Sequence, residues 1–353
     1  MNMFNELKIL ELSNVLAGPA VGMFFAELGA KVIKVENKLS KGDITRNWKL
    51  PKEKKEDLSA YFCSVNYNKK HIFLDFNNEE DTLVLEKLIK ECNIIITNFK
   101  DGDAKKFNLD FESCKTIKSD IIYAHIGGFK SNPKRVAFDI ILQAETGFIK
   151  MTGNKDAYAK MPVAFIDVLA AHQIKEGILT ALILQKKENK AFKITTTLEE
   201  TAIASLMNQS SNFLMANYSP QPIGTLHPNI SPYGEIISTL DNQNLILAIG
   251  TDKQFEIFCD LIGLEKKCTQ LFKNNSHRVK EREHLLKLIN KKTKKIKSKN
   301  LLNSCHELKI PIGEINSMKE VLEKKVAKEM ILEETIGNQK TKRVKTIAFK
   351  LTN

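Results

Sequence analysis

One carboxylate stands out for its surroundings, because Asp167 lies between two apolar segments. It closes the segment PVAFID (162–167) and begins the largely apolar run DVLAAHQIKEGILTALILQ (167–185). At the head of a helix an Asp serves as an N-cap, since its oxygens accept hydrogen bonds from free N–H groups of the first turn. Partial desolvation between apolar segments also makes a carboxylate more nucleophilic, and Asp is a known covalent nucleophile. The residues alone leave both roles open.

Two histidines are candidate partners for acid–base chemistry. His125 ends a predicted strand, and His172 follows Asp167 by five residues. Residues five positions apart lie on different faces of a helix, so direct pairing of His172 with Asp167 is not expected. We predict that His172 is a packed histidine.

A second candidate site is the predicted strand-to-helix turn NVLAGP (14–19). Gly18 permits a tight turn of the backbone, and Pro19 suits the first turn of a helix. Such a turn presents free N–H groups at the carboxyl edge of a sheet, where α/β proteins usually bind ligands. The GxGxxG fingerprint of dinucleotide sites is absent. The spacing is therefore equally compatible with a structural turn and a ligand-binding loop.

Polar residues also flank two further predicted strands. Lys69 and Lys70 precede the third strand, and Asn98 and Phe99 follow the fourth. In one interpretation these are turn residues and solvated lysines. In the other, the lysines contact phosphate while Asn98 and Phe99 lie near a nucleotide at the carboxyl edge.

These candidates are carried by short β-rich runs that alternate with helical patterns, which is typical of βαβ units. Right-handed crossovers between such strands predict an α/β fold with a doubly wound, Rossmann-like parallel sheet. The predicted strands are 8–12, 31–35, 71–75, 93–97, 121–125 and 193–197, and the predicted helices are 19–28, 79–92, 167–185 and 198–216. The helix that Asp167 heads is apolar on nearly every face, so it is expected to be buried against the sheet.

The composition shifts after this region, where a loop carries prolines at positions 220, 222 and 228. Such a shift indicates a domain boundary. We predict a large Rossmann-like domain over 1–200, a smaller α+β domain over 217–315 and a C-terminal segment over 316–353. Within the latter two we predict a hairpin turning at 241–243, helices at 252–262, 278–308 and 317–330, and a closing β run at 346–351.

The length of 353 residues exceeds what one hydrophobic core usually supports, which agrees with two domains. No apolar run is long enough to span a membrane, and the first ten residues are too polar for a signal peptide. The six cysteines are scattered without metal-site spacing, which indicates free thiols and no metal. We therefore expect a cytoplasmic protein without a membrane partner.

The formal net charge of +12 raises the question of nucleic-acid binding. The densest basic run, 291–299 (KKTKKIKSK), has no interleaved aromatic residue that could stack on bases. We therefore expect no nucleic-acid partner. A positive surface would still attract a smaller polyanion.

Taken in order along the chain, these segments resemble the family III CoA-transferases. That family includes formyl-CoA and carnitine CoA-transferases and the related 2-methylacyl-CoA racemases. The resemblance covers nearly the whole chain, and the order and spacing of its pieces make it specific. The pieces are LSNVLAGPAVGMFFAELGAKVIKVE (12–36), GDITR (42–46), NYNKKHIFLD (66–75), ITNFKDG (96–102), FDIILQAETG (138–147), PVAFIDVLAAHQIKEGILTAL (162–182) and HPNISPYGEI (227–236).

The resemblance implies a large Rossmann-like domain to which 316–353 returns, a smaller middle domain, and a homodimer of two interlinked chains. It implies a coenzyme A thioester as substrate and no permanently bound cofactor. By position, Asp167 is the catalytic aspartate, and Phe138 and Asp139 lie beside the reacting thioester. The CoA-binding residues implied are Val15, Leu16, Ala17, Asn37, Lys69, Asn98, Phe99 and Lys106.

The activity implied is the transfer of CoA from an acyl-CoA donor to a carboxylic acid through a covalent intermediate on Asp167. Racemases of this group instead pair the aspartate with a His immediately before Asp139. That position is Phe138 here, which cannot transfer a proton. Leu16 stands where formyl-CoA transferases carry Gln, and Ala171 where relatives carry a glycine. A racemase-like enzyme and a non-catalytic CoA-binding relative are the alternatives.

Overall fold

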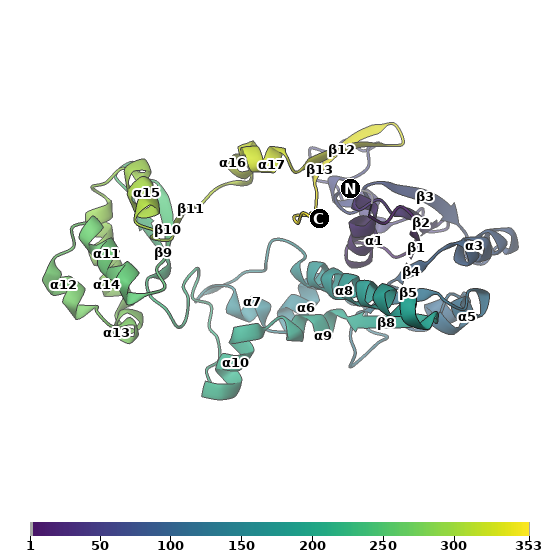
Figure 1. Cartoon of the computed structure of the whole chain (residues 1–353), viewed down its shortest axis with the longest axis horizontal. Helices are drawn as coiled ribbons and strands as arrows, with labels where there is room; N and C mark the ends of the chain where they lie inside the picture. The colour runs from purple at the N-terminus through teal and green to yellow at the C-terminus, as the bar shows by residue number, and fades with distance from the viewer. Residues whose placement is uncertain (1–2, 353) are drawn as a thin grey trace. The chain divides into compact units, whose positions relative to one another are not determined.

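The computed structural model describes residues 3–352. These residues form two compact units, each built from more than one segment of the chain (Figure 1). Unit 1 comprises residues up to 148, 160–211 and 325 onward, and unit 2 comprises 149–159 and 212–324. Within the described range, no helix is long and apolar enough to cross a membrane.

Unit 1 is built on a parallel sheet. Among residues 3–352, six parallel strands join in the order β3-β2-β1-β4-β5-β8. They are β1 (Lys8–Leu12), β2 (Lys31–Asn37), β3 (Lys69–Leu74), β4 (Ile94–Thr97), β5 (Ile122–Gly127) and β8 (Phe192–Thr197). The predicted α/β class, parallel sheet and strand positions are thus confirmed. The order reverses direction between β1 and β4, which opens a crevice at their carboxyl ends.

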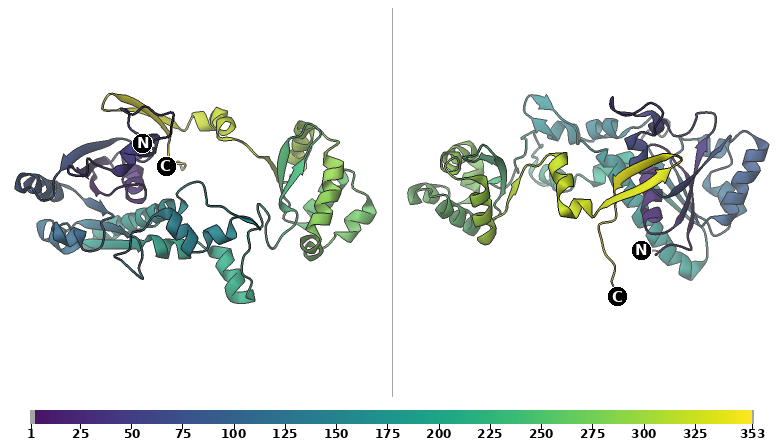
Figure 2. Two further views of the ribbon diagram at one scale, coloured as in Figure 1. Left: turned by 180° about the vertical axis from the view of Figure 1, so that it is seen from behind. Right: turned by 90° about the horizontal axis from the view of Figure 1, so that it is seen from above.

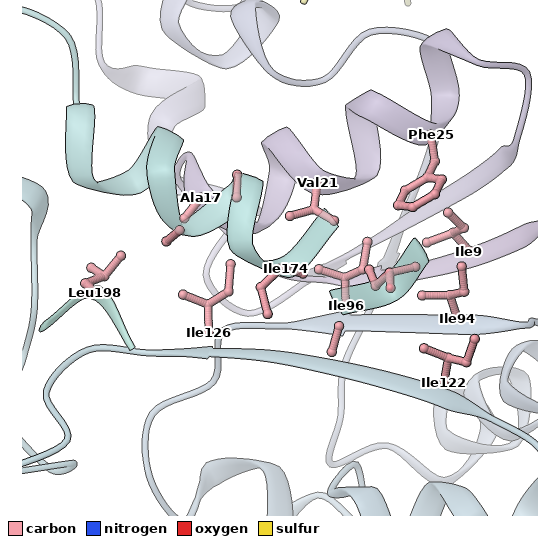
Figure 3. Packing of buried hydrophobic residues seen from close by; sticks show 14 of the residues in the cluster. Ile9, Ala17, Val21, Phe25, Ile94, Ile96, Ile122, Ile126, Ile174 and Leu198 are labelled. Carbon is pink, nitrogen blue, oxygen red and sulfur yellow. The ribbon is translucent and has the colours of Figure 1, made fainter. Parts of the chain in front are cut away.

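Buried side chains alternate between the two faces of this sheet. Ile94 and Ile96 of β4 point to one core, and Ile95 between them points to the other. Figure 3 shows the first core, in which α1 (Ala17–Glu27) and α8 (Phe165–Glu188) pack on the strands. The second core lies under α3 (Glu79–Glu91) and α5 (Phe111–Ile117). Helices therefore cover both faces, as buried parallel strands require.

The remaining helices of unit 1 are short. Helix α6 (Asp139–Glu145) and helix α9 (Leu198–Ala204) both pack against α8. The predicted helix over 198–216 is in fact divided, because α9 ends at Ala204 and α10 begins at Met207, which has a positive φ of 44°. The others are the 3-10 helix η1 (Ile44–Asn47), α2 (Ala60–Ser64), α4 (Asp103–Lys106), α7 (Phe148–Met151) and α10 (Met207–Ala216), of which α7 and α10 run from unit 1 into unit 2.

Unit 2 contains an antiparallel sheet in the order β11-β10-β9 with helices packed on it. The predicted hairpin is confirmed, since β9 (Tyr233–Ser238) and β10 (Asn244–Ala248) flank its turn. The other elements are β6 (Gly153–Asn154), β7 (Ala157–Tyr158), α11 (Asp252–Leu261), α12 (Lys266–Leu271), α13 (Asn275–Lys280), α14 (Arg282–Thr293), α15 (Ser298–Glu307) and β11 (Ile312–Glu314).

The prediction of one helix over 278–308 was wrong, because the chain turns between α14 and α15. The turn lets both helices bury apolar side chains in one core, Leu285 and Ile289 from α14 and Leu301 and Cys305 from α15. A straight helix through the lysine-rich segment could not bring both pairs to that core.

The C-terminal part of the chain returns to unit 1. After α16 (Met318–Glu323) and α17 (Lys325–Lys328), strands β12 (Ile331–Ile336) and β13 (Gln339–Val344) form a hairpin that lies beside the N-terminal elements of unit 1 (Figure 2). Arg343 forms an ion pair with Glu27 of α1 at 2.5 Å. The predicted closing strand over 346–351 was wrong, because the N–H groups of Thr346 and Ile347 donate to the Glu27 carboxylate instead of to a sheet.

Candidate functional site

A cleft of about 700 Å³ opens in unit 1 at the carboxyl ends of β1, β4, β5 and β8. Its walls are the segments that follow these strands, together with Asp167 at the start of α8. Parallel strands deliver the segments after their carboxyl ends to one edge of the sheet, so residues far apart in sequence meet there. The lining residues are Asn14, Val15, Leu16, Ala17, Asn98, Phe99, Lys100, Asp101, Asp103, His125, Ile126, Gly127, Gly128, Phe129, Lys130, Pro133, Arg135, Val136, Ala137, Phe138, Asp167, Thr195, Thr196, Thr197, Leu198 and Glu200.

Asp167 is the buried acid of this cleft. Its exposed fraction is 7%, and no residue between 3 and 352 donates a hydrogen bond to its carboxylate. Burial, and secondly the negative charge of Asp139, raise the pKa of Asp167 from 3.8 to about 7. A carboxylic acid with such a pKa exchanges its proton near neutral pH, as catalytic carboxyls do.

The structure rules out one of the two roles considered for Asp167, the N-cap. Helix α8 begins at Phe165, so Asp167 is the third residue of the helix. The first-turn N–H groups are capped from α6 instead: Asp139 Oδ1 accepts from Ile166 N at 2.7 Å and from Asp167 N at 3.4 Å. Because Asp139 takes over the capping, the Asp167 carboxylate stays free for other work.

The partners of Asp139 fix its position. Its Oδ2 accepts a hydrogen bond from Gln143 Nε2 at 2.6 Å, and Gln143 Oε1 accepts from Met161 N at 2.9 Å. Phe138 precedes it as the N-cap residue of α6, with 45% of its side chain exposed at the cleft. The structure thus brings Phe138, Asp139 and Asp167 together, as the sequence resemblance implies.

The loop between β1 and α1 forms the facing wall, with Val15, Leu16 and Ala17 lining the cleft. Asn98 holds the start of this loop, because its Oδ1 accepts from Asn14 N at 3.0 Å and its Nδ2 donates to Asn14 O at 2.8 Å. The loop is tight. A Cβ at position 18 would lie 2.3 Å from Ser13 Oγ, so the glycine there permits the turn.

The residues expected to bind the adenine and phosphates of a nucleotide are only partly in the cleft. Asn98 and Phe99 line it, whereas Asn37, Lys69 and Lys106 do not. Lys106 is exposed, with its Nζ 5.2 Å from the Phe107 ring centre, and Asn37 Oδ1 accepts from Leu39 N within its own turn.

The position of Lys69 contradicts the hypothesis that it contacts phosphate. Its side chain is fully buried, and its Nζ lies 2.8 Å from Glu11 Oε2 and 2.8 Å from Pro19 O. Burial lowers the pKa of Lys69 to about 8. Because its donors are engaged inside the protein, this lysine stabilises the β1–α1 region rather than a phosphate.

Sequence reasoning missed the basic side chains that do line the cleft. Lys100 follows β4, and Lys130 and Arg135 follow β5. Lys130 is paired with Glu200, and Arg135 is paired with Glu145 at 2.5 Å. Lys100 follows the strand predicted over 93–97 by three residues, which is a signal that the sequence offers, whereas Lys130 and Arg135 lie farther along a loop and have no such signal.

Sequence reasoning also missed Tyr61 of α2, which lies close enough to Asp167 for the charge of that carboxylate to shift the Tyr61 pKa. Burial, followed by the charges of Asp167, Asp139 and Asp43, raises the pKa of Tyr61 to about 12. Tyr61 belongs to a small apolar cluster beside the cleft, whose buried members are Leu16, Met23 and Val65 and whose partly buried members include Tyr67, Ala164 and Val168. This cluster provides an apolar wall next to the acid.

The two candidate histidines differ in their surroundings. His125 lines the cleft, where its Nδ1 lies 2.9 Å from Thr97 Oγ1, and burial lowers its pKa. His172 does not line the cleft. Its side chain lies on the exposed face of α8, so the prediction of a packed histidine was wrong, whereas the predicted separation from Asp167 agrees with this position. Among residues 3–352, no group of side chains is arranged to hold a metal ion.

Comparison with known proteins identifies the family of the chain. The family model described as CoA-transferase family III matches residues 4–353. A succinate–glutarate CoA-transferase from Agrobacterium fabrum is 33% identical over 89% of this chain and 80% of its own length. A human succinyl-CoA:glutarate CoA-transferase is 30% identical over 89% of this chain and 72% of its own length.

A solved structure leads to the same family. The crystal structure of a CaiB/BaiF family protein from Brucella suis is 34% identical, covers 97% of this chain and 91% of its own, and superposes with a TM-score of 0.81. The match of the family model along nearly the whole sequence, the identity to the named transferases and this shared structure agree. The chain belongs to CoA-transferase family III, whose members are enzymes that use coenzyme A thioesters as substrates.

Proposed function

We propose that this enzyme moves CoA from an acyl-CoA donor to a carboxylic acid acceptor through covalent intermediates on Asp167. The observation that carries the proposal is the Asp167 carboxyl group in the cleft, buried, without a donor among the described residues, and with a pKa near 7. Such a group is ionised in a large fraction of molecules at neutral pH. Its desolvation makes the ionised form reactive.

In the first step, an oxygen of the Asp167 carboxylate attacks the thioester carbonyl carbon. The C–S bond breaks, CoA leaves as the thiolate, and a mixed anhydride joins Asp167 to the acyl group. The thiolate then attacks the Asp167 carbonyl of the anhydride and releases the donor acid as its carboxylate. Asp167 is left as an aspartyl-CoA thioester.

In the second half, the acceptor carboxylate attacks the aspartyl thioester and releases the thiolate again. The thiolate attacks the acceptor's acyl carbon in the new anhydride, which forms the product thioester and restores the Asp167 carboxylate. Each step exchanges one acyl bond for another, so no external energy source is needed. Burial of Asp167 keeps water from the activated intermediates.

Two groups around Asp167 have supporting roles. The N–H groups at the start of α1, beside Leu16 and Ala17, are directed to the developing oxyanion of each tetrahedral intermediate. Asp139 holds the first turn of α8 and, through its charge, opposes ionisation of Asp167. Phe138 offers no proton-transferring group, which disfavours the racemase alternative.

For the substrates, we propose succinyl-CoA as donor and a dicarboxylic acid of the glutarate type as acceptor. The support is that the Agrobacterium relative is named a succinate–glutarate CoA-transferase and the human relative a succinyl-CoA:glutarate CoA-transferase. The apolar side chains of Val15, Leu16 and Ala17, which line the cleft, fit the methylene groups of such acids. The basic side chains Lys100, Lys130 and Arg135 of the cleft fit the negative charges of CoA and of the distal carboxylate.

The test is a transfer assay with succinyl-CoA and glutarate, in which glutaryl-CoA is separated by chromatography. We expect glutaryl-CoA with the wild type and a loss of on the order of 10⁴-fold in turnover with Asp167→Asn. Asp110→Asn is the matched control, because Asp110 caps α5 outside the cleft. Normal turnover by Asp167→Asn would disprove the nucleophilic role.

We further propose that unit 1 is a Rossmann-like CoA-binding domain, that unit 2 is the small domain, and that two chains form an interlinked homodimer. The dimer is supported by exposed apolar side chains on α10, where Phe213, Leu214 and Met215 are 50%, 80% and 88% exposed. Contiguous exposed apolar groups favour burial by a partner. Light scattering during size-exclusion chromatography should give twice the mass of the chain, and the monomer mass would contradict the dimer.

A further inference from the structure

Four charged side chains lie together beneath the loop that joins β1 to α1. Lys34 Nζ lies 3.0 Å from Glu11 Oε1 and 3.1 Å from Asp43 Oδ2, and it donates to Ser13 O at 2.5 Å. Lys69 completes the group through Glu11. The four side chains are fully buried or nearly so. Buried charges are costly unless paired, so a cluster at this place calls for a reason beyond stability.

The loop above the cluster contains a strained residue. Val15 has a φ of +72°, in the left-handed region that a β-branched residue rarely adopts. Its N–H points to Asp43, with Oδ2 at 3.1 Å and Oδ1 at 3.3 Å. Asp43 is thus the acceptor that offsets the strain at Val15, and the ion pair with Lys34 holds the Asp43 carboxylate in place.

Asp43 is itself fixed from the other side. Its N–H donates to Glu36 Oε2 at 2.8 Å, and Arg46 pairs with the same carboxylate at 2.7 Å through Nε. Asp43 Oδ1 also accepts from Thr45 N at 3.0 Å. The segment GDITR (42–46) therefore forms a rigid support for one carboxylate that faces the loop.

The conformation of Val15 determines where the next N–H groups point. Leu16 and Ala17 line the cleft and begin α1, and no side chain of the described residues caps this helix end. With a negative φ at Val15, the chain would enter α1 from another direction. The free N–H groups of the first turn would then point elsewhere.

We infer that Asp43 is a positioning residue for the reaction, which holds Val15 in its left-handed conformation so that the α1 N–H groups face the reacting carbonyl. The inference rests on the proposed function, because it assigns those groups to the oxyanion. Asp43 does not line the cleft and contacts no substrate. Its effect passes through the backbone of Val15.

The test uses a rescue that a merely structural role would not produce. Asp43→Ala removes both oxygens that accept from Val15 N. It should lower kcat for succinyl-CoA:glutarate transfer by on the order of 10²-fold, with a smaller change in KM, because oxyanion donors act in the transition state. Adding Val15→Gly should restore kcat at least 10-fold, since glycine adopts a positive φ without an anchor. The ion pair with Lys34 stays broken in the double variant, so the denaturant midpoint should remain low.

Absence of rescue in a folded double variant, or a loss confined to KM, would overturn the inference. Val15→Pro covers the case in which Asp43→Ala does not fold, because proline fixes φ near −65° and leaves the buried charges intact. We expect the same loss of kcat from Val15→Pro, and wild-type kcat would equally overturn the inference. Asp110→Ala, which removes the N-cap of α5 outside the cleft, should leave kcat unchanged.

Failure of the proposed function has a different signature. If the wild type transfers no CoA and forms no adduct on Asp167, the proposed function fails before any variant is compared. If the wild type is active and the Val15→Gly rescue is missing, only the role of Asp43 fails.

Discussion

The charge of Asp139 provides a quantitative prediction about the acid beside it. A rise of the Asp167 pKa from 3.8 to about 7 corresponds to about 4 kcal/mol in favour of the neutral acid. Burial is the larger cause and Asp139 the smaller. The share of Asp139 is therefore at most about 2 kcal/mol, which is about 1.5 pH units.

Asp139→Asn removes that charge and keeps an oxygen that can accept from Ile166 N. The Asp167 carboxylate is the nucleophile, so the rate of acylation rises as pH passes its pKa. We expect a midpoint near pH 7 in the wild type and a midpoint lower by up to about 1.5 in the variant, still above the ordinary value of 3.8.

The assay is the single-turnover consumption of succinyl-CoA between pH 5 and pH 9. Glu79→Gln is the control, because it removes one negative charge from the exposed start of α3, outside the cleft. Its midpoint should equal that of the wild type. An unchanged or higher midpoint in Asp139→Asn would refute the reasoning that this charge opposes ionisation of Asp167.

Three stability predictions follow from other buried charges. Burial raises the pKa of Asp167 in the folded state, so the wild type loses free energy of unfolding as pH rises from 3.8 to about 7. In urea denaturation, Asp167→Asn should therefore be more stable than the wild type by up to about 4 kcal/mol at pH 8 and equally stable at pH 3. Lys175 lies over the Phe24 ring, and burial lowers its pKa to about 8. Lys175→Met should therefore raise the free energy of unfolding by up to about 3 kcal/mol at pH 7, and this gain should be gone by pH 10.5. Lys69→Met should lower the free energy of unfolding by about 3–5 kcal/mol, because Glu11 loses one of its ion-pair partners. Titration calorimetry should find the affinity for CoA unchanged in this variant.

The strands of unit 1 could be predicted because each is a short apolar run between turn residues. Their parallel pairing was predicted from the helices between them, and the strands do pair in parallel, although the sequence pattern did not predict the order of the strands in the sheet. The closing strand over 346–351 could not be excluded, because a β-rich pattern does not reveal that the Glu27 carboxylate, far away in the sequence, takes the N–H groups of Thr346 and Ile347.

The candidate site shows the same limit. Asp167 was found because its local pattern, one acid between apolar segments, is visible in the sequence. Its freedom from capping depends on Asp139, which lies 27 residues from Ile166 and caps α8 across space. The phosphate-binding prediction treated Lys69 as a solvated lysine before a strand. Its ion-pair partner, Glu11, lies on another strand, and the sequence pattern does not reveal that pair.

The most direct test of the account is intact mass spectrometry of the protein incubated with succinyl-CoA and then with hydroxylamine. Hydroxylamine converts an activated aspartyl group into a hydroxamate, which peptide mapping locates. We predict a hydroxamate at Asp167 in the wild type and none in Asp167→Ala. Active wild-type enzyme without a hydroxamate, or one located at another residue, would contradict the claim that Asp167 carries the acyl group.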